Sequence, residues 1–137
     1  MHEFTHAAVF ELAGWDVPRW LNEGLADFVC GDVPASSHPD ARKAASEHSG
    51  ILKAARLSSD LGDMNKRKDN PELVDAAYML AGSLVAFWVE HYGLASVRAA
   101  LEAIGKGVSP EAAFYDSTGV SLARIERDWR NSLRGVD

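Results

Sequence analysis

The chain has 137 residues, of which 47% are hydrophobic and 25% are charged. This length is ordinary for one domain, and it can bury a substantial core without disulfide bonds. The formal net charge of −6 argues against nucleic acid and anionic membrane surfaces as partners. The single cysteine, Cys30, cannot form an internal disulfide, and we expect it to be a small buried apolar residue. No apolar run approaches the length of a membrane span, so we expect no transmembrane segment.

The first part of the chain is predicted to form two helices around a turn. Residues 2–13 are apolar on nearly every side, which is typical of a buried helix. Gly14 ends this helix, and Pro18 lies at the end of the turn that follows. The second helix is expected from about Trp20 to Val29.

A polar, alanine-rich helix is predicted next, over residues 39–57, followed by a charged loop over residues 58–71. The clearest helical pattern comes after this loop, over residues 72–91, where apolar side chains recur at spacings of three and four. The same pattern continues over residues 94–105.

Two shorter helices are expected at the end of the chain. One begins at Ser109 and reaches about Asp116, and the last begins at Ser121, because a serine is a favourable N-cap residue. No segment alternates between apolar and polar residues with a period of two. The chain is therefore predicted to be all-α, with about six to seven helices.

The chain opens with the pattern His-Glu-x-x-His at residues 2–6. Two histidines four residues apart lie on one face of a helix, so the imidazoles of His2 and His6 can converge on one zinc ion. Glu3 can then act as a general base toward water at that ion. The alternative is a helix with two solvent-facing histidines. The apolar character of the segment disfavours it, since buried histidines need partners.

A catalytic zinc needs a third protein ligand. Glu23 lies on the second predicted helix, after a turn long enough to let this helix fold back antiparallel to the first. Asp27 lies one turn further on the same face, where it can accept a hydrogen bond from the outer nitrogen of a ligating histidine. Alone, the two acids would more simply be surface carboxylates. Together with the two histidines, they favour a metal site.

The two motifs together resemble the gluzincin zinc peptidases. In these enzymes, a zinc helix with His-Glu-x-x-His is followed by a helix with Asn-Glu-x-x-x-Asp, and residues 22–27, Asn-Glu-Gly-Leu-Ala-Asp, match the second motif. Residues 18–26 are similar to the bacterial peptidase-MA-like domains in particular, and residues 78–93 and 112–129 resemble the same group.

The resemblance implies a zinc-dependent hydrolase of peptide bonds, either a metalloendopeptidase or an aminopeptidase-like enzyme. The resemblance also implies one Zn²⁺ held by His2, His6 and Glu23, with Glu3 as catalytic base and with Asn22 and Asp27 supporting the ligands. Family members often use a downstream tyrosine or histidine to stabilise the oxyanion, which makes Tyr78 a further candidate. A tyrosine half-buried in helix packing is the simpler interpretation of Tyr78.

Two other functions stay open from the sequence. One is a zinc-binding module without catalysis, and the other is a helical partner-binding module without a metal, both derived from the same fold. The expected partner of the enzyme is a peptide or protein substrate. The compartment is open: cytoplasmic for the chain as it stands, and outside the cytoplasm if an upstream signal or anchor is missing.

In the family that the chain resembles, a β-sheet precedes the zinc helix. Because the chain starts at the motif, we expect residues 1–137 to be a single helical domain, the C-terminal subdomain of a zincin without its upstream sheet. The first helix would then lack its cover, and Phe4, Val9 and Phe10 would form an exposed apolar patch. We expect a homodimer to cover this patch.

Overall fold

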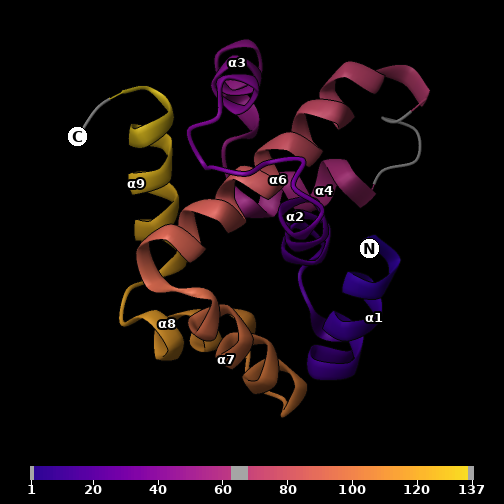
Figure 1. Cartoon of the computed structure of the whole chain (residues 1–137), viewed down its shortest axis with the longest axis vertical. Helices are drawn as coiled ribbons and strands as arrows, with labels where there is room; N and C mark the ends of the chain where they lie inside the picture. Colours follow the sequence, from indigo (N-terminus) through magenta and orange to yellow (C-terminus); the bar gives the residue numbers. More distant parts are fainter. Residues whose placement is uncertain (1, 63–67, 136–137) are drawn as a thin grey trace.

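A long central helix, α6 (Pro71–Tyr92), organises the fold, as the computed structural model shows (Figure 1). The structure describes residues 2–62 and 68–135, without the side chain of His2. Pro71 stands in the first turn of α6, and the side chain of Asn70 accepts a hydrogen bond from the Leu73 N–H at 3.2 Å. Gly93, with a φ of 82°, ends the helix.

Seven other α-helices of the described ranges surround α6, and these ranges contain no strand. The helices are α1 (His2–Ala13), α2 (Arg19–Val29), α3 (Pro39–Glu47), α4 (Ala54–Gly62), α7 (Leu94–Gly105), α8 (Pro110–Thr118) and α9 (Leu122–Leu133). Two short 3-10 helices join them, η1 (Gly14–Asp16) and η2 (Ser49–Ile51). The prediction of an all-α fold is confirmed. The described ranges contain eight α-helices, consistent with the expected all-α subdomain of about six to seven helices.

The predicted helix over residues 39–57 is in fact two helices, and α4 runs on into the predicted loop. Contacts from α9 stabilise the break. The Glu126 carboxylate accepts a hydrogen bond from the Ala54 N–H at 3.2 Å, and Arg130 donates to the Leu52 carbonyl at 3.0 Å. These side chains satisfy backbone groups that a helix start and a loop leave unpaired. Because both contacts span more than 70 residues, local sequence patterns do not reveal them.

Length and composition alone would let α6 cross a membrane, contrary to the expectation that no apolar run is long enough. Here the apolar residues of α6 belong to the core of the protein, because 67% of its most apolar stretch is buried inside the protein. Every residue from Leu80 to Trp88 is buried against the surrounding helices. A helix that is apolar all round is the expected core of such a bundle. The absence of a transmembrane segment stays a prediction.

Aromatic side chains fill the core between α2, α6 and α8. Trp20 contacts Trp88 and Phe114 at ring-centroid distances of 6.4 and 5.9 Å. Trp129 is also fully buried, and its indole N–H donates to the Ser83 hydroxyl at 2.9 Å. Trp15 differs from the other three tryptophans, because it is 90% exposed. It follows the end of α1 and contacts only Phe10 among the aromatic rings of the described residues.

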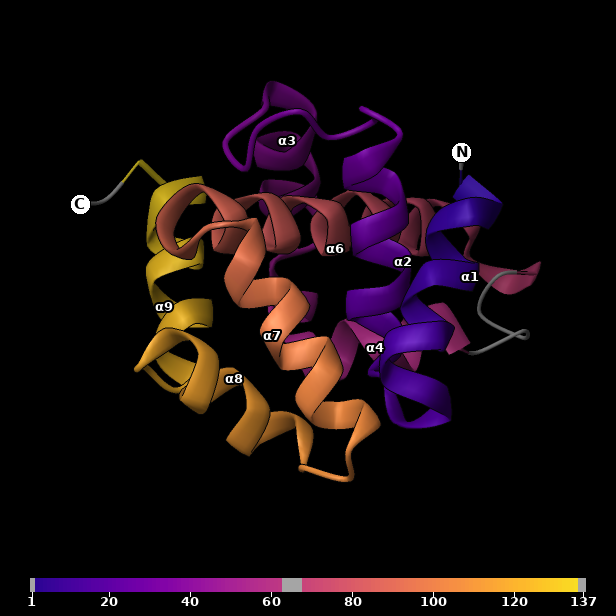
Figure 2. The same ribbon diagram turned by 60° about the horizontal axis from the view of Figure 1, so that its bottom comes forward.

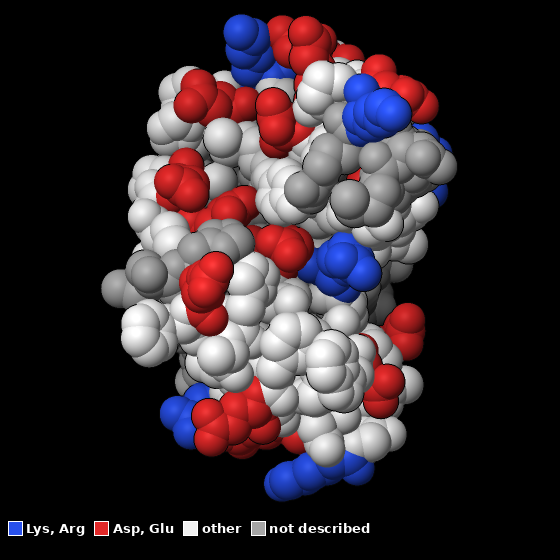
Figure 3. Space-filling view, turned by 90° about the vertical axis from the view of Figure 1, so that its right-hand side faces the viewer, with Lys and Arg blue, Asp and Glu red and all other residues white. Residues whose placement is uncertain are grey.

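The first helix is less buried than its sequence predicts. Phe4 is 79% exposed and Phe10 is 38% exposed, whereas Val9 points into the core and is 1% exposed. The expected patch is therefore corrected: it contains the two phenylalanines and not Val9. An apolar groove of about 280 Å³ lies beside Phe4, with Leu94 on its far wall. Figure 3 looks onto the side of the molecule that carries α1 and shows a largely uncharged area over its lower half.

We propose that a second copy of the chain covers this apolar surface of α1. Exposed apolar surface of this kind favours association. In sedimentation or light scattering, we expect a homodimer that Phe4→Ser shifts toward the monomer. The matched control is Tyr115→Ser, which removes an exposed aromatic ring on α8. A monomer at all accessible concentrations, or a dimer that the Phe4 change leaves intact, would contradict the proposal.

Candidate metal centre

Helix α2 presents two polar side chains beside α1. Trp20, Leu21 and Leu25 of α2 are buried in the core, while Asn22 and Glu23 are only partly buried. The tight turn at Gly14, with a φ of 70°, reverses the chain between the two helices. Helices α1 and α2 pack against each other, as Figure 2 shows. The two halves of the sequence motif therefore meet in space.

His6 of α1 contacts Asn22 of α2 directly. The His6 Nδ1 atom lies 2.7 Å from the Asn22 Oδ1 atom. An amide oxygen only accepts hydrogen bonds, so the shared hydrogen belongs to Nδ1. In the neutral ring this leaves Nε2 as an electron-pair donor. Such an outer-nitrogen hydrogen bond is the usual way in which proteins orient a metal-ligating histidine.

The other ring nitrogen of His6 faces Glu23. The distance from His6 Nε2 to Glu23 Oε2 is 3.5 Å, and the two side chains are only 21% and 18% exposed. The Nε2 lone pair and the carboxylate oxygen are both electron-pair donors. At this distance, a cation that both atoms share stabilises them, either a proton on His6 or a metal ion. Tetrahedral zinc with ordinary bond lengths separates a nitrogen and an oxygen ligand by about 3.3–3.5 Å. The pair therefore fits zinc in both chemistry and spacing.

The other two chemically important residues of the His-Glu-x-x-His motif are His2 and Glu3, and the structure describes the side chain of Glu3 alone. The side chain of His2 lies outside the described residues, so the set of three ligands stays a prediction. Among the side chains that are described, no three of His, Cys, Asp or Glu gather as a metal site. Glu3 lies in the first turn of α1, and its side chain is exposed.

The family of this chain follows from comparison with known proteins. A family model described as the peptidase MA superfamily matches residues 1–135. The chain belongs to the peptidase MA superfamily. This match confirms the resemblance drawn from the two motifs, and it extends over the helices that follow them. Searches of curated proteins and of solved structures give no match to this chain.

Two other candidate residues of this peptidase MA chain lie on or beside α6. Asp27 is partly buried. It lies close to α6, because a Cβ atom added to Gly82 of that helix would be 3.4 Å from the Asp27 Cβ. Asn22 contacts the Nδ1 atom of His6, and the support that Asp27 gives to a ligating histidine stays a prediction. Tyr78 is half-buried and packs against the core, as the simpler interpretation expects. Its role toward substrate stays a prediction.

Gly24 of this peptidase MA chain lies where α2 packs closely on α6, and the sequence motifs did not single it out. A Cβ atom here would overlap the Ala81 carbonyl group of α6 and would lie 2.9 Å from a methyl group of Val85. Only glycine allows α2 to approach α6 this closely, and the neighbouring residue is Glu23. The signal in the sequence is the glycine inside Asn-Glu-Gly-Leu-Ala-Asp, where helix propensity alone would favour alanine.

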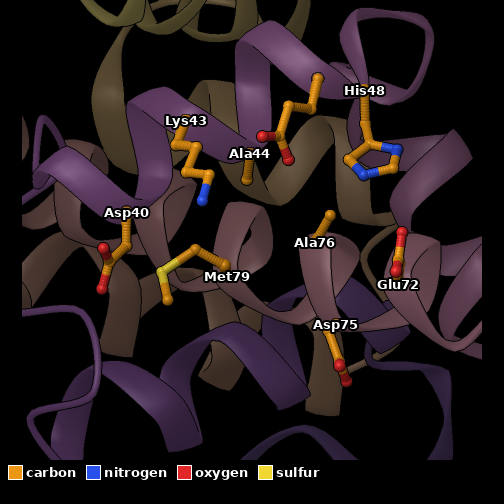
Figure 4. Close-up of a pocket in the computed structure, with 9 residues that line it drawn as sticks. Asp40, Lys43, Ala44, His48, Glu72, Asp75, Ala76 and Met79 are labelled. Atoms are coloured by element: carbon orange, nitrogen blue, oxygen red, sulfur yellow. The ribbon is translucent and has the colours of Figure 1, made fainter.

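One cavity in the described part of the chain lies away from these residues. Its volume is about 460 Å³, and it lies between α3 and α6 (Figure 4). Lys43 and His48 share its lining with four acidic side chains, Asp40, Glu47, Glu72 and Asp75. None of the predicted ligands, and neither Glu3 nor Tyr78, lines this cavity. This cavity is therefore not part of the candidate metal centre.

Proposed function

We propose that this chain holds the zinc site of a gluzincin-type peptidase, which hydrolyses peptide bonds. The observation that carries the proposal is the approach of His6 Nε2 to Glu23 Oε2 at 3.5 Å, with Asn22 on the opposite ring nitrogen. The match to the peptidase MA superfamily supports the class of reaction. The substrate is a peptide or a protein.

In this proposal, His2, His6 and Glu23 would hold one zinc ion. When bound, the ion would polarise the scissile carbonyl and make a water molecule more acidic. Asn22 keeps the His6 ring in the tautomer whose Nε2 is an electron-pair donor, and so prevents the ring from turning away. The Glu23 carboxylate adds a negative charge that offsets part of the charge of the cation.

Glu3 would perform the proton transfers. Its exposed carboxylate, in the turn of α1 before His6, takes a proton from the attacking water as the oxygen–carbon bond forms. The same proton then passes to the leaving amine as the carbon–nitrogen bond breaks. The atoms balance as one water consumed for one peptide bond cleaved. Tyr78 is the candidate donor to the oxyanion that develops on the carbonyl oxygen.

The first test is zinc binding. We expect the metal-free protein to take up one zinc ion per chain in a calorimetric titration, with elemental analysis as a second readout. His6→Ala and Glu23→Gln should each abolish tight binding because each removes a ligand. Asn22→Ala should weaken binding by about 10–100-fold, the usual effect of losing an orienting hydrogen bond.

His48→Ala is the matched control. This histidine lies after α3 and lines the cavity between α3 and α6, away from the candidate metal centre. Zinc affinity unchanged by His6→Ala would overturn the ligand assignment. Protein that binds no zinc at all would favour a helical partner-binding module. Zinc binding without cleavage of any peptide would favour a non-catalytic zinc module.

A further inference from the structure

A second cavity, of about 370 Å³, lies between α3, η2 and the end of α9. Figure 1 places α3 and the C-terminal end of α9 on one side of α6, and α1 on the other side. The cavity is thus remote from the candidate metal centre. The charged side chains that line it are Arg42 and Arg134, and no acidic residue among the described ones does. This lining is unusual in a chain with 20 acidic and 14 basic residues.

Within the part of the chain that the structure describes, the two arginines of this cavity have no carboxylate partner, whereas most other arginines have one. Five described arginines lie within 3.9 Å of a carboxylate oxygen: Arg56, Arg98, Arg124, Arg127 and Arg130. Arg42 and Arg134 make no such ion pair within the described ranges. Two guanidinium groups that share one cavity without an acid leave positive charge there for a ligand to neutralise.

One of the two guanidinium groups, that of the exposed Arg42, makes a hydrogen bond to the backbone. Arg42 donates from Nε to the Ser37 carbonyl at 3.1 Å, which orients its planar group. A Cβ atom on Gly135 would lie 3.9 Å from Arg42 Nη1, so this guanidinium lies beside the chain immediately after Arg134. The two arginines are 92 residues apart in the sequence, and the packing of α3 against α9 brings them together.

The rest of the lining suits an anion with a small apolar body. Leu52 and Leu133 supply apolar wall, and Ser46 and Ser49 supply hydroxyl groups. The Leu52 carbonyl, which would otherwise repel an anion, accepts a hydrogen bond from Arg130 at 3.0 Å. The volume lies at the lower end of the range for small-molecule sites.

We propose that this cavity binds a small organic oxyanion, with a phosphate or carboxylate group at Arg42 and Arg134 and an apolar body against Leu52 and Leu133. Both headgroups share the same recognition chemistry, because planar guanidinium groups donate paired hydrogen bonds to either. The site is independent of the proposed peptidase chemistry.

The test is calorimetric titration of the whole chain with phenyl phosphate, benzoate and inorganic phosphate. We expect saturable binding of at least one aromatic anion, tighter than inorganic phosphate and weakened by added salt. The stronger of the two aromatic probes identifies the headgroup. Arg134→Gln and Arg42→Gln should each weaken that binding by about tenfold or more, as expected for the loss of charge-assisted hydrogen bonds.

Arg98→Gln is the matched control, because it removes the same charge from an exposed arginine that pairs with Glu102 on α7. It should leave the affinity unchanged. Arg134 follows the last helix, so its substitution tests the site without threatening the fold. Failure of all three probes to bind would overturn the proposal, as would an Arg134→Gln effect no larger than that of Arg98→Gln.

Discussion

Replacing Glu3 by glutamine should lower peptidase activity by at least about 10²–10⁴-fold while zinc content stays unchanged. Glutamine keeps the size of the side chain and much of its hydrogen bonding, but it cannot accept the proton of the attacking water. Because the Glu3 side chain is exposed, the change should leave the thermal midpoint almost unaltered. The measurements are kcat/KM of the protein on a mixed peptide substrate, and zinc content by elemental analysis.

Glu11→Gln provides the matched control for this prediction. Glu11 is another exposed acid on α1, so its replacement changes the charge of the same helix by the same amount. Its activity should remain at the level of the unchanged protein. Full activity of Glu3→Gln would show that Glu3 is structural and that the proposed mechanism is wrong. Loss of zinc would show that Glu3 is a ligand or supports one, and the assignment of Glu23 would have to be reopened.

Replacing Gly24 by alanine should destabilise the fold by about 1–3 kcal/mol or more, the cost of overpacking a tight contact. Alanine favours helices over glycine by about 1 kcal/mol, which works in the opposite direction. The steric effect should win because the added methyl group meets the backbone carbonyl of Ala81, which cannot move without displacing α6. We expect a lower free energy of unfolding in urea.

The same substitution should also affect the candidate metal centre. If α2 shifts away from α6, Glu23 moves with it, and zinc affinity should fall in protein that is still folded. Gly50→Ala is the control, since nothing lies within 4 Å of the position of its Cβ atom. That change should alter stability by no more than about 1 kcal/mol. Equal stability of the two variants would show that α2 and α6 tolerate a wider separation than the structure indicates.

The sequence by itself determined the helical class and the candidate chemistry. Apolar spacings of three and four over residues 72–91 predicted α6, and serine N-caps predicted the starts of α8 and α9. These signals are local, because a helix satisfies its backbone within one segment. The pairing of His-Glu-x-x-His with Asn-Glu-x-x-x-Asp was equally visible, and the family match covers both motifs.

Only the tertiary structure decided which residues meet, because the contacts concerned join segments far apart in the chain. Contacts from α9 to Leu52 and Ala54 separate α3 from α4, although the sequence reads as one helix there. Packing likewise buries Val9 and leaves Trp15 in solvent, although both are apolar. The approach of His6 to Glu23 depends on how closely α2 packs, and no periodic pattern encodes that distance.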